Sequence, residues 1–478
     1  MATWLSVGAA ARGDRVVTAA APPAVEAGLR VLAEGGNAFD AAVTMALVET
    51  VCLPMKCGLA GDLVALVRAP DGALGCLLSI GPGAGALGSG AVPTETGGGS
   101  VGVPGAPAGY ARLAALGRFD LPALVAPAIE AATRGVAWSE VAVRLTAEAE
   151  DLLRRHNGET VFLPEGRLPR VGETLRLPGL TRLLGDFAEL GETLFHGAHG
   201  EAIRDRVREA GGFLELADLA VDPAAWRAPA RLPLGGGAVL VATPAPTHGP
   251  ALLNAADLVL HHRRDPVAAA REARRAMTDD AGALAVGGTS VVTAADDEGN
   301  AVVLVHSNSY PQYGSGLVVR DLDLVLNNRP GRGFDASAPV DSPRAPAPGR
   351  VPPTTRHAWA GVDGRTTTLG ATPGGINQMI WNLQSVLAAC DGAAPDEICR
   401  APRWSLDTGG RLTIEADHRD AGRPDGRRVA AGSMRSAQQV LRLDATAAGA
   451  AAAADRRTGA VAGTLGTNGQ GHEGTAVV

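Results

Sequence analysis

The stretch that decides the fold is GGTSVVT, residues 287–293, and the turn residues EGN follow it at 298–300. Two glycines precede a hydroxyl residue that opens an apolar, β-branched run, which predicts a strand beginning near Thr289. A cut between Gly288 and Thr289 would place the Oγ nucleophile and its general base, the freed α-amine, on one residue. An unperturbed α-amine has a pKa of about 7.7–8.0, so part of it is neutral near pH 7 and accepts a proton. The same residues also fit an ordinary turn that enters a strand.

The hydrophobic pattern changes from mainly helical before this stretch to mainly strand-like after it. On the N-terminal side the spacing predicts helices over 22–34, 38–51 and much of 107–220, strands over 63–67, 74–80 and 231–243, and helices over 252–260 and 266–277. On the C-terminal side it predicts a hairpin of 291–295 with 301–306, strands over 317–326, 358–362 and 366–369, a helix over 378–389, and a short helix or loop over 446–454.

Composition limits the class of protein. The chain has 478 residues, of which 46% are hydrophobic and 19% charged, so it predicts a soluble globular protein with a large core. The net charge of −7 gives no reason to expect a nucleic-acid partner. No apolar run reaches transmembrane length and no signal peptide is evident, so we expect a cytoplasmic protein without a membrane partner. The five cysteines are dispersed, so neither a metal site nor a cofactor is expected.

Several short motifs stand in the order found in the γ-glutamyltransferase family of N-terminal-nucleophile hydrolases, which the chain resembles over nearly its whole length. They are GGNAFDAA at 35–42, GVPG at 102–105, Thr289 at the nucleophile position, LNN at 326–328, TPGG at 372–375, APR at 401–403 and GSM at 432–434. The resemblance implies an α/β fold, the four-layer αββα sandwich. It also implies self-cleavage into a large subunit, 1–288, and a small subunit, 289–478, which associate as one intertwined unit.

The resemblance also implies roles at the site. Thr289 would be the nucleophile, and the backbone N–H groups of Gly374 and Gly375 would form the oxyanion hole, a role that glycine suits because the backbone can approach closely. Ser307 would hydrogen-bond the Thr289 hydroxyl, and Asn308 would line the site. Without the resemblance, the glycine pair is equally an ordinary turn, and Ser307 is equally a hydroxyl on a strand face.

Departures from the family concern the substrate. Glutamyl-specific members hold the substrate α-carboxylate with an Arg that is missing from LSIGPG at 78–83. The acidic position that holds the α-amine falls on Arg332 and a neighbouring Gln position on Arg329, while the family's Ser-Ser pair corresponds to Thr354-Thr355. An α-amine would be repelled by Arg332, whereas two guanidinium groups suit a carboxylated small molecule. The alternative is that both arginines are surface residues of an arginine-rich chain.

Asp62, in the segment that replaces the family's glycine-rich run, has two interpretations: a helix or turn cap, or a group that orients the amine of Thr289.

The chain is similar in these respects to the γ-glutamyltransferase homologues of actinobacterial 4-alkylproline biosynthesis, which makes parts of antibiotics. Those homologues hydrolyse a C–C bond and remove an oxalyl unit from a pyrroline dicarboxylate. The resemblance implies the same reaction here. Three alternatives stay open: a γ-glutamyl hydrolase or transferase acting on glutathione-like substrates, an amide acylase, and a non-catalytic scaffold. A homodimer also stays open.

Overall fold

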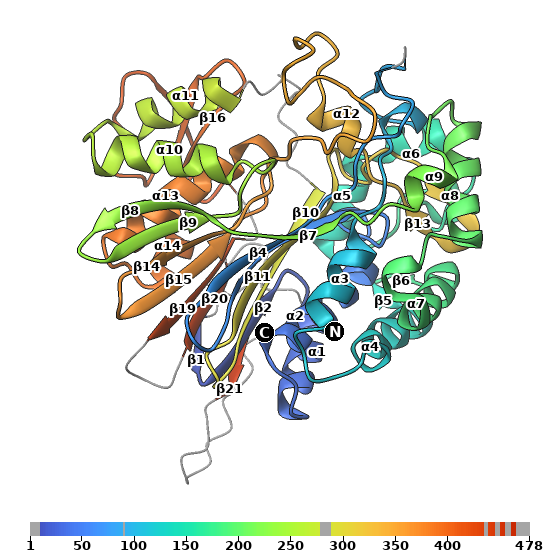
Figure 1. Cartoon of the computed structure of the whole chain (residues 1–478), viewed down its shortest axis with the longest axis horizontal. Coiled ribbons are helices and arrows are strands. Elements are labelled where there is room, and N and C mark those ends of the chain that lie inside the picture. The colour runs from blue at the N-terminus through green and yellow to red at the C-terminus, as the bar shows by residue number, and fades with distance from the viewer. Residues whose placement is uncertain are drawn as a thin grey trace.

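The computed structural model of the protein describes residues 10–88, 91–277, 288–434, 438–444, 450–454 and 460–464. Two seven-stranded sheets lie face to face, and helices cover the outer face of each (Figure 1). The helices of the first part of the chain lie on one side, and α10 (Gly249–Leu260), α11 (Pro266–Met277) and α13 (Gln378–Cys390) lie on the other. The expected four-layer αββα sandwich is confirmed.

The first sheet contains the strand that opens at the Gly-Gly-Thr stretch. Its strands, in spatial order, are β21 (Ala460–Thr464), β2 (Arg15–Ala19), β10 (Gly288–Ala295), β11 (Ala301–Ser309), β3 (Asp62–Arg68), β4 (Leu74–Ser79) and β7 (Ala224–Arg227). Each strand is antiparallel to its neighbours. The predicted hairpin is therefore confirmed as β10 and β11, at the centre of the sheet.

The second sheet faces the first. Its strands, in spatial order, are β1 (Ala10–Gly13), β20 (Ala450–Ala454), β19 (Gln439–Asp444), β15 (Thr366–Ala371), β14 (Trp359–Val362), β9 (Ala238–Ala242) and β8 (Ala230–Gly235). Both sheets combine strands that precede Gly288 with strands that follow it, so neither half of the chain forms a complete sheet alone.

Helices α1 (Pro22–Ala33) and α2 (Ala38–Cys52) pack against the first sheet, and the GGNAFDAA motif makes the turn between them. The Asn37 side chain accepts a hydrogen bond from the Asp40 N–H at 3.1 Å, and the Asp40 carboxylate accepts one from the Asn37 N–H at 2.8 Å. This capping box satisfies N–H groups that a buried helix start would otherwise leave unpaired.

The remaining elements surround these layers. The other helices are α3 (Ala106–Ala114), α4 (Leu121–Arg134), α5 (Glu140–Glu148), α6 (Glu150–His156), α7 (Pro178–Leu190), α8 (Ala198–Glu209), α9 (Leu216–Leu219), α12 (Arg329–Gly333) and α14 (Pro395–Arg400). Short strands pair outside the two sheets: β5 (Val136–Ala137) with β6 (Thr174–Leu175), and β16 (Trp404–Leu406) with β17 (Leu412–Glu415), which also pairs with β18 (Gly426–Val429).

Side chains alternate between the two faces of β11, which fixes where its polar residues point. Val302 and Leu304 belong to the core under α1 and α2, whereas Val303 and Val305 belong to the core between the sheets. By the same alternation, Ser307 points between the sheets and His306 points toward the helices.

Two expectations were wrong. Residues 317–326 form no single strand, because β12 (Val318–Val319) folds back onto β13 (Leu324–Val325). Asp323 makes the reversal with a left-handed φ of 48°, and its carboxylate accepts a hydrogen bond from the Gly179 N–H at 2.7 Å. In the run 446–454, residues 445–449 lie outside the described part, and Ala450–Ala454 is the strand β20 rather than a helix or loop. Pairing with β1 and β19 outweighs the helix preference of alanine there.

The buried side chain of His357 should make the free energy of unfolding fall as the pH is lowered. Its side chain is fully buried, with Nδ1 2.8 Å from the Thr355 carbonyl oxygen and Nε2 2.9 Å from the Asn382 side-chain nitrogen. Burial lowers the pKa of His357 from 6.5 to about 3, because it disfavours the charged ring. Below pH 6.5 the unfolded chain therefore binds a proton that the folded chain does not bind until about pH 3.

We expect His357→Gln to reduce this sensitivity. Between pH 7 and pH 5 the wild-type free energy of unfolding should fall by about 2 kcal/mol more than that of the variant. Denaturant titrations at both pH values measure the difference. His261→Gln is the control and should show the same fall in stability between pH 7 and pH 5 as wild type. The His261 side chain is 39% exposed and, among the described residues, forms an ion pair with Asp257 alone. Equal acid sensitivity in wild type and His357→Gln would contradict the prediction.

Candidate active site

Thr289, Ser307 and Asp62 lie side by side on three neighbouring strands. Thr289 of β10 is opposite Ser307 of β11, and Ser307 is opposite Asp62 of β3. Directly opposed residues share a face of the sheet, so all three side chains point into the space between the sheets. All three are buried, with 3% or less of each residue exposed.

Ser307 links the two groups that self-cleavage requires. The Thr289 hydroxyl donates to Ser307 Oγ at 3.2 Å, and Ser307 Oγ donates to the carbonyl oxygen of Gly288. The Ser309 N–H also donates to Ser307 Oγ, at 2.8 Å. A register shift between Gly288 and Thr289 lets one hydroxyl reach both sides of the same peptide bond. The predicted contact between Ser307 and Thr289 is present.

Gly374 and Gly375 follow β15 and require glycine. Their φ angles are +142° and +56°, and a Cβ at Gly374 would lie 2.4 Å from the Trp381 ring. Both residues are buried, and within the described residues neither backbone N–H donates a hydrogen bond. Two buried N–H groups without acceptors are what an oxyanion hole supplies before substrate binds.

Asn308 is held against the loop between α2 and β3. Its Nδ2 donates to the Pro54 carbonyl oxygen at 3.2 Å, and its buried Oδ1 has no hydrogen-bond partner among the described residues. A Cβ at Gly61 would lie 2.5 Å from the Ser307 carbonyl oxygen and 2.8 Å from Asn308 Oδ1. The loop can therefore approach the end of β11 only because residue 61 is glycine.

Arg329 is fully engaged by an internal partner. Its Nε donates to the Asp62 carboxylate at 2.9 Å, and the side chains are 4% and 2% exposed. A second guanidinium, that of Arg356, pairs with the same carboxylate and also donates to the Asp62 carbonyl oxygen at 2.8 Å. Asp62 is therefore the shared ion-pair partner of two arginines. Neither sequence interpretation of Asp62 included this role.

The electrostatics of Asp62 follow from these pairs. Burial would raise the pKa of its carboxyl, but attraction and hydrogen bonds from Arg329 and Arg356 outweigh burial and lower it. The carboxylate is thus ionised at neutral pH.

Arg332 has different partners from Arg329. Its Nε donates to the Tyr310 carbonyl oxygen at 3.0 Å, and its guanidinium sits over the Tyr310 ring at 4.7 Å. It also pairs at 3.3 Å with Glu95, whose side chain is 66% exposed. Tyr310 follows Ser309, which is opposite Gly288, so Arg332 lies close to the start of β10.

Thr354 and Thr355 lie next to Arg356. Thr354 Oγ1 accepts a hydrogen bond from Arg356 Nε at 3.2 Å, and Thr355 Oγ1 accepts one from Gln378 Nε2 at 3.4 Å. Sequence reasoning singled out both threonines but missed Arg356. The available signal was a basic residue directly after the threonine pair.

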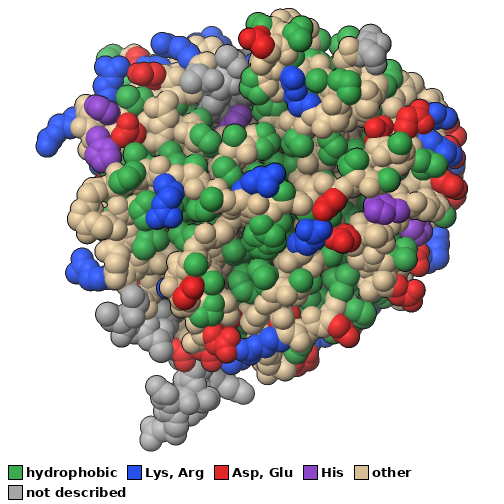
Figure 2. Space-filling model, viewed as in Figure 1, with side chains coloured by type: hydrophobic (Ala, Val, Ile, Leu, Met, Phe, Trp, Pro, Cys, Tyr) green, Lys and Arg blue, Asp and Glu red, His purple; other side chains and the backbone are tan. Residues whose placement is uncertain are grey.

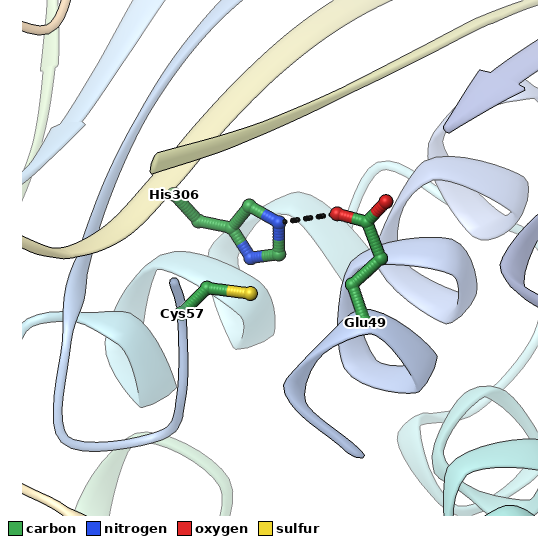
Figure 3. A group of neighbouring side chains, drawn as sticks. All are labelled: Glu49, Cys57 and His306. Carbon is green, nitrogen blue, oxygen red and sulfur yellow. Dashed lines mark hydrogen bonds and ion pairs between the residues drawn. The ribbon is translucent and has the colours of Figure 1, made fainter. Parts of the chain in front are cut away.

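Glu49, Cys57 and His306 form a buried cluster on the opposite face of β11 (Figure 3). Both ring nitrogens of His306 are engaged: Nε2 lies 2.9 Å from the Glu49 carboxylate and Nδ1 lies 2.8 Å from the Tyr110 hydroxyl. Burial and the nearby Glu49 carboxylate raise the pKa of the Cys57 thiol well above its usual value, which favours the thiol over the metal-binding thiolate. The donor chemistry therefore fits a structural network that anchors β11 to α2 and α3 better than a metal site.

On the face shown in Figure 2, acidic and basic side chains are interspersed. Within the described residues, no helix is both long and apolar enough to cross a membrane.

Comparison with curated proteins finds acylases and glutathione hydrolases. The glutathione hydrolase proenzyme of Bacillus subtilis strain 168 is 29% identical over 238 residues, which cover 45% of this chain and 40% of that protein. The acylase ACY 1 proenzyme of Pseudomonas sp. strain SE83 is 32% identical over 218 residues, which cover 42% of this chain and 39% of that protein. The matched region thus spans about 40% of the length of these relatives.

Solved structures match over nearly the whole chain. A cephalosporin acylase from Bacillus halodurans superimposes with a TM-score of 0.81 at 26% identity, covering 96% of this chain and 97% of that one. A structure described as LmbA2991T421A has a TM-score of 0.77 at 22% identity, covering 95% and 99%, and this likeness concerns the fold.

The gamma-glutamyltranspeptidase family model matches residues 24–275 and 261–464. Together with the layered fold, this match shows that the chain belongs to the γ-glutamyltranspeptidase family and has the fold of N-terminal-nucleophile hydrolases.

Proposed function

We propose that this protein is a hydrolase that activates itself by cutting its own chain between Gly288 and Thr289. The observation that carries the proposal is the Ser307 hydroxyl, which accepts from the Thr289 hydroxyl and donates to the Gly288 carbonyl oxygen. The products are chains 1–288 and 289–478, which stay associated because both sheets combine strands from both chains.

The cut follows from this hydrogen-bonded chain. Thr289 Oγ attacks the Gly288 carbonyl carbon and passes its proton to Ser307, while Ser307 passes its own proton to the carbonyl oxygen. The C–N bond then breaks, and the hydroxyl of the intermediate returns its proton to the departing nitrogen, which leaves Gly288 as an ester on Thr289 Oγ and frees the α-amine. Water hydrolyses the ester, which leaves a carboxylate on Gly288 and restores the Thr289 hydroxyl.

The same threonine then acts on the substrate. Its α-amine removes the hydroxyl proton as Oγ attacks a carbonyl carbon, and the N–H groups of Gly374 and Gly375 stabilise the resulting oxyanion. The leaving group takes the proton from the amine, and water releases the acyl group from Thr289.

The proposed substrate is a carboxylated small molecule, and the proposed bond is a C–C bond whose cleavage releases an oxalyl unit as oxalate. Arg332 supports a carboxylate over an α-amine, because its guanidinium lies near the start of β10 and its present partner, Glu95, is mostly exposed. The Arg332 side chain is only 12% exposed, but the exposed Glu95 carboxylate is held weakly and can be exchanged for a substrate carboxylate. A carbanion next to a second carbonyl is delocalised, which makes it an acceptable leaving group.

An amide acylase is the second candidate. It is favoured by the likeness to the cephalosporin acylase structure, which extends over nearly the whole of both chains. The steps at Thr289 are the same, with an amine in place of the carbanion as leaving group.

Self-cleavage is tested with three variants. Thr289→Ala should remain a single chain, and Ser307→Ala should cleave about 100-fold more slowly, because it loses both the relay and the donor to the Gly288 carbonyl. Ser290→Ala is the matched control and should leave the rate unchanged, since this neighbouring buried hydroxyl has no hydrogen-bond partner in the described part of the chain. Denaturing electrophoresis follows the rate, and N-terminal sequencing should begin at Thr289. A wild-type chain that stays uncut would contradict the proposal.

The reaction is tested with three probes on the cleaved enzyme. Acetylpyruvate should be hydrolysed to oxalate and acetone faster than glutaryl-p-nitroanilide or γ-glutamyl-p-nitroanilide releases p-nitroaniline, and Thr289→Ala should be inactive with all three. Release from the glutaryl probe without oxalate formation would favour the amide acylase. Dominant turnover of the γ-glutamyl probe would overturn the carboxylate proposal.

A further inference from the structure

The cluster of Asp62, Arg329 and Arg356 carries more positive than negative charge. One carboxylate faces two guanidinium groups, and all three residues are 3% exposed or less. Among the described residues, no other carboxylate pairs with either arginine. A buried charge without a counter-ion is costly, so folded proteins keep one mainly where a ligand supplies the missing charge.

One buried nitrogen of this cluster, Nη2 of Arg356, has no hydrogen-bond partner among the described residues. Arg356 uses Nε on Thr354 Oγ1 and Nη1 on Asp62, whereas its Nη2 is buried and donates no hydrogen bond to any residue that the structure describes. Burial and the neighbouring Arg329 lower the pKa of Arg356 to about 10, which still leaves its guanidinium charged at neutral pH. An unpaired, charged donor is a strong binding group for an anion.

The cluster is close to the nucleophile. Asp62 is opposite Ser307, and Ser307 is opposite Thr289, so Asp62 and Thr289 are separated by two strand spacings, about 10 Å. Arg356 lies just before β14 of the second sheet and reaches across to Asp62 of the first. It therefore closes the same end of the inter-sheet space at which Thr289 begins its strand.

We propose that Arg356 Nη2 binds a carboxylate of the substrate that lies several bonds from the carbonyl attacked by Thr289. This proposal rests on the proposed function and deepens it by assigning a second acidic group to the substrate. Asp62 and Arg329 form a neutral pair that holds Arg356 in place and leaves one face of its guanidinium to the ligand. The site thus selects an elongated dicarboxylate over a monocarboxylate or a neutral acyl chain.

A structural role and a binding role for Arg356 make opposite predictions about the stability of an Arg356 variant. If Arg356 serves only as an ion-pair partner, Arg356→Met should lower the melting temperature of the unliganded protein. If it is a binding residue, Arg356→Met removes an uncompensated buried charge and leaves Asp62 paired with Arg329, so the melting temperature should stay the same or rise.

Isothermal titration of the full chain with succinate, glutarate and adipate tests the site, with the matching neutral diamides as references. At least one dicarboxylate should bind wild type more tightly than its diamide. Arg356→Met should weaken that binding by at least ~30-fold, and Arg356→Lys should weaken it less, because it keeps the charge but loses the planar fork.

Arg442→Met is the matched control. Arg442 is also partly buried, but it donates to the neutral oxygens of Thr368 and Ala393. This variant should bind the dicarboxylate as wild type does. Failure of all three dicarboxylates to bind wild type, or equal binding to wild type and Arg356→Met, would overturn the proposal.

The same samples separate this proposal from the proposed function. If the chain never cleaves but binds a dicarboxylate through Arg356, the proposed anion site is supported and the proposed hydrolase is contradicted. If the chain cleaves normally but its dicarboxylate binding does not depend on Arg356, the anion site is contradicted and the hydrolase is supported.

Discussion

The pairing of β10 with β11 is the constraint on which the rest of the site depends. Its register places Ser307 beside both Thr289 and the Gly288 carbonyl, and the register of β11 with β3 places Asp62 next in line. A slip of one residue would turn every one of these side chains to the opposite face. The face behind the site is anchored as well, because His306 is hydrogen-bonded by Glu49 and Tyr110 from α2 and α3. Hydrogen bonds on both faces therefore hold the same strand end.

Electrostatics divide the site into two parts. Around Thr289 the groups are neutral: the Ser307 hydroxyl, the Gly288 carbonyl and the Ser309 N–H, which form one hydrogen-bonded chain. Around Asp62 the groups are charged and buried, and they carry one positive charge in excess. Burial amplifies the effect of that charge because water cannot screen it. In the two proposals, chemistry and recognition therefore fall to different residues, and the two sets meet where Ser307 of β11 is opposite Asp62 of β3.

Sequence reasoning succeeded where local pattern and tertiary structure agree. Helices α1 and α2 have helical spacing, and Asn37 is a capping signal for α2. The hairpin has β-branched residues around a glycine turn, so the helices and the hairpin were predictable. Strand β20 was not, because pairing with distant strands decides its conformation. In the site, the contact of Ser307 with Thr289 was expected from the resemblance to the family, and the structure contains it. The pairing of Arg329 with Asp62 was not predictable, since residues separated by 267 positions meet only in the folded chain. Arg356 was missed for the same reason.

The mixed composition of the two sheets has a consequence for timing. Strand β10 lies between β2, which comes from early in the chain, and β11, which comes after the cut. The Ser307 hydroxyl reaches Gly288 only when these strands have assembled, so the proposed cut is conditional on a finished fold. A misfolded chain would keep Thr289 locked in a peptide bond, without a free amine and without activity. Activation would then need no protease, and only correctly folded molecules would become active.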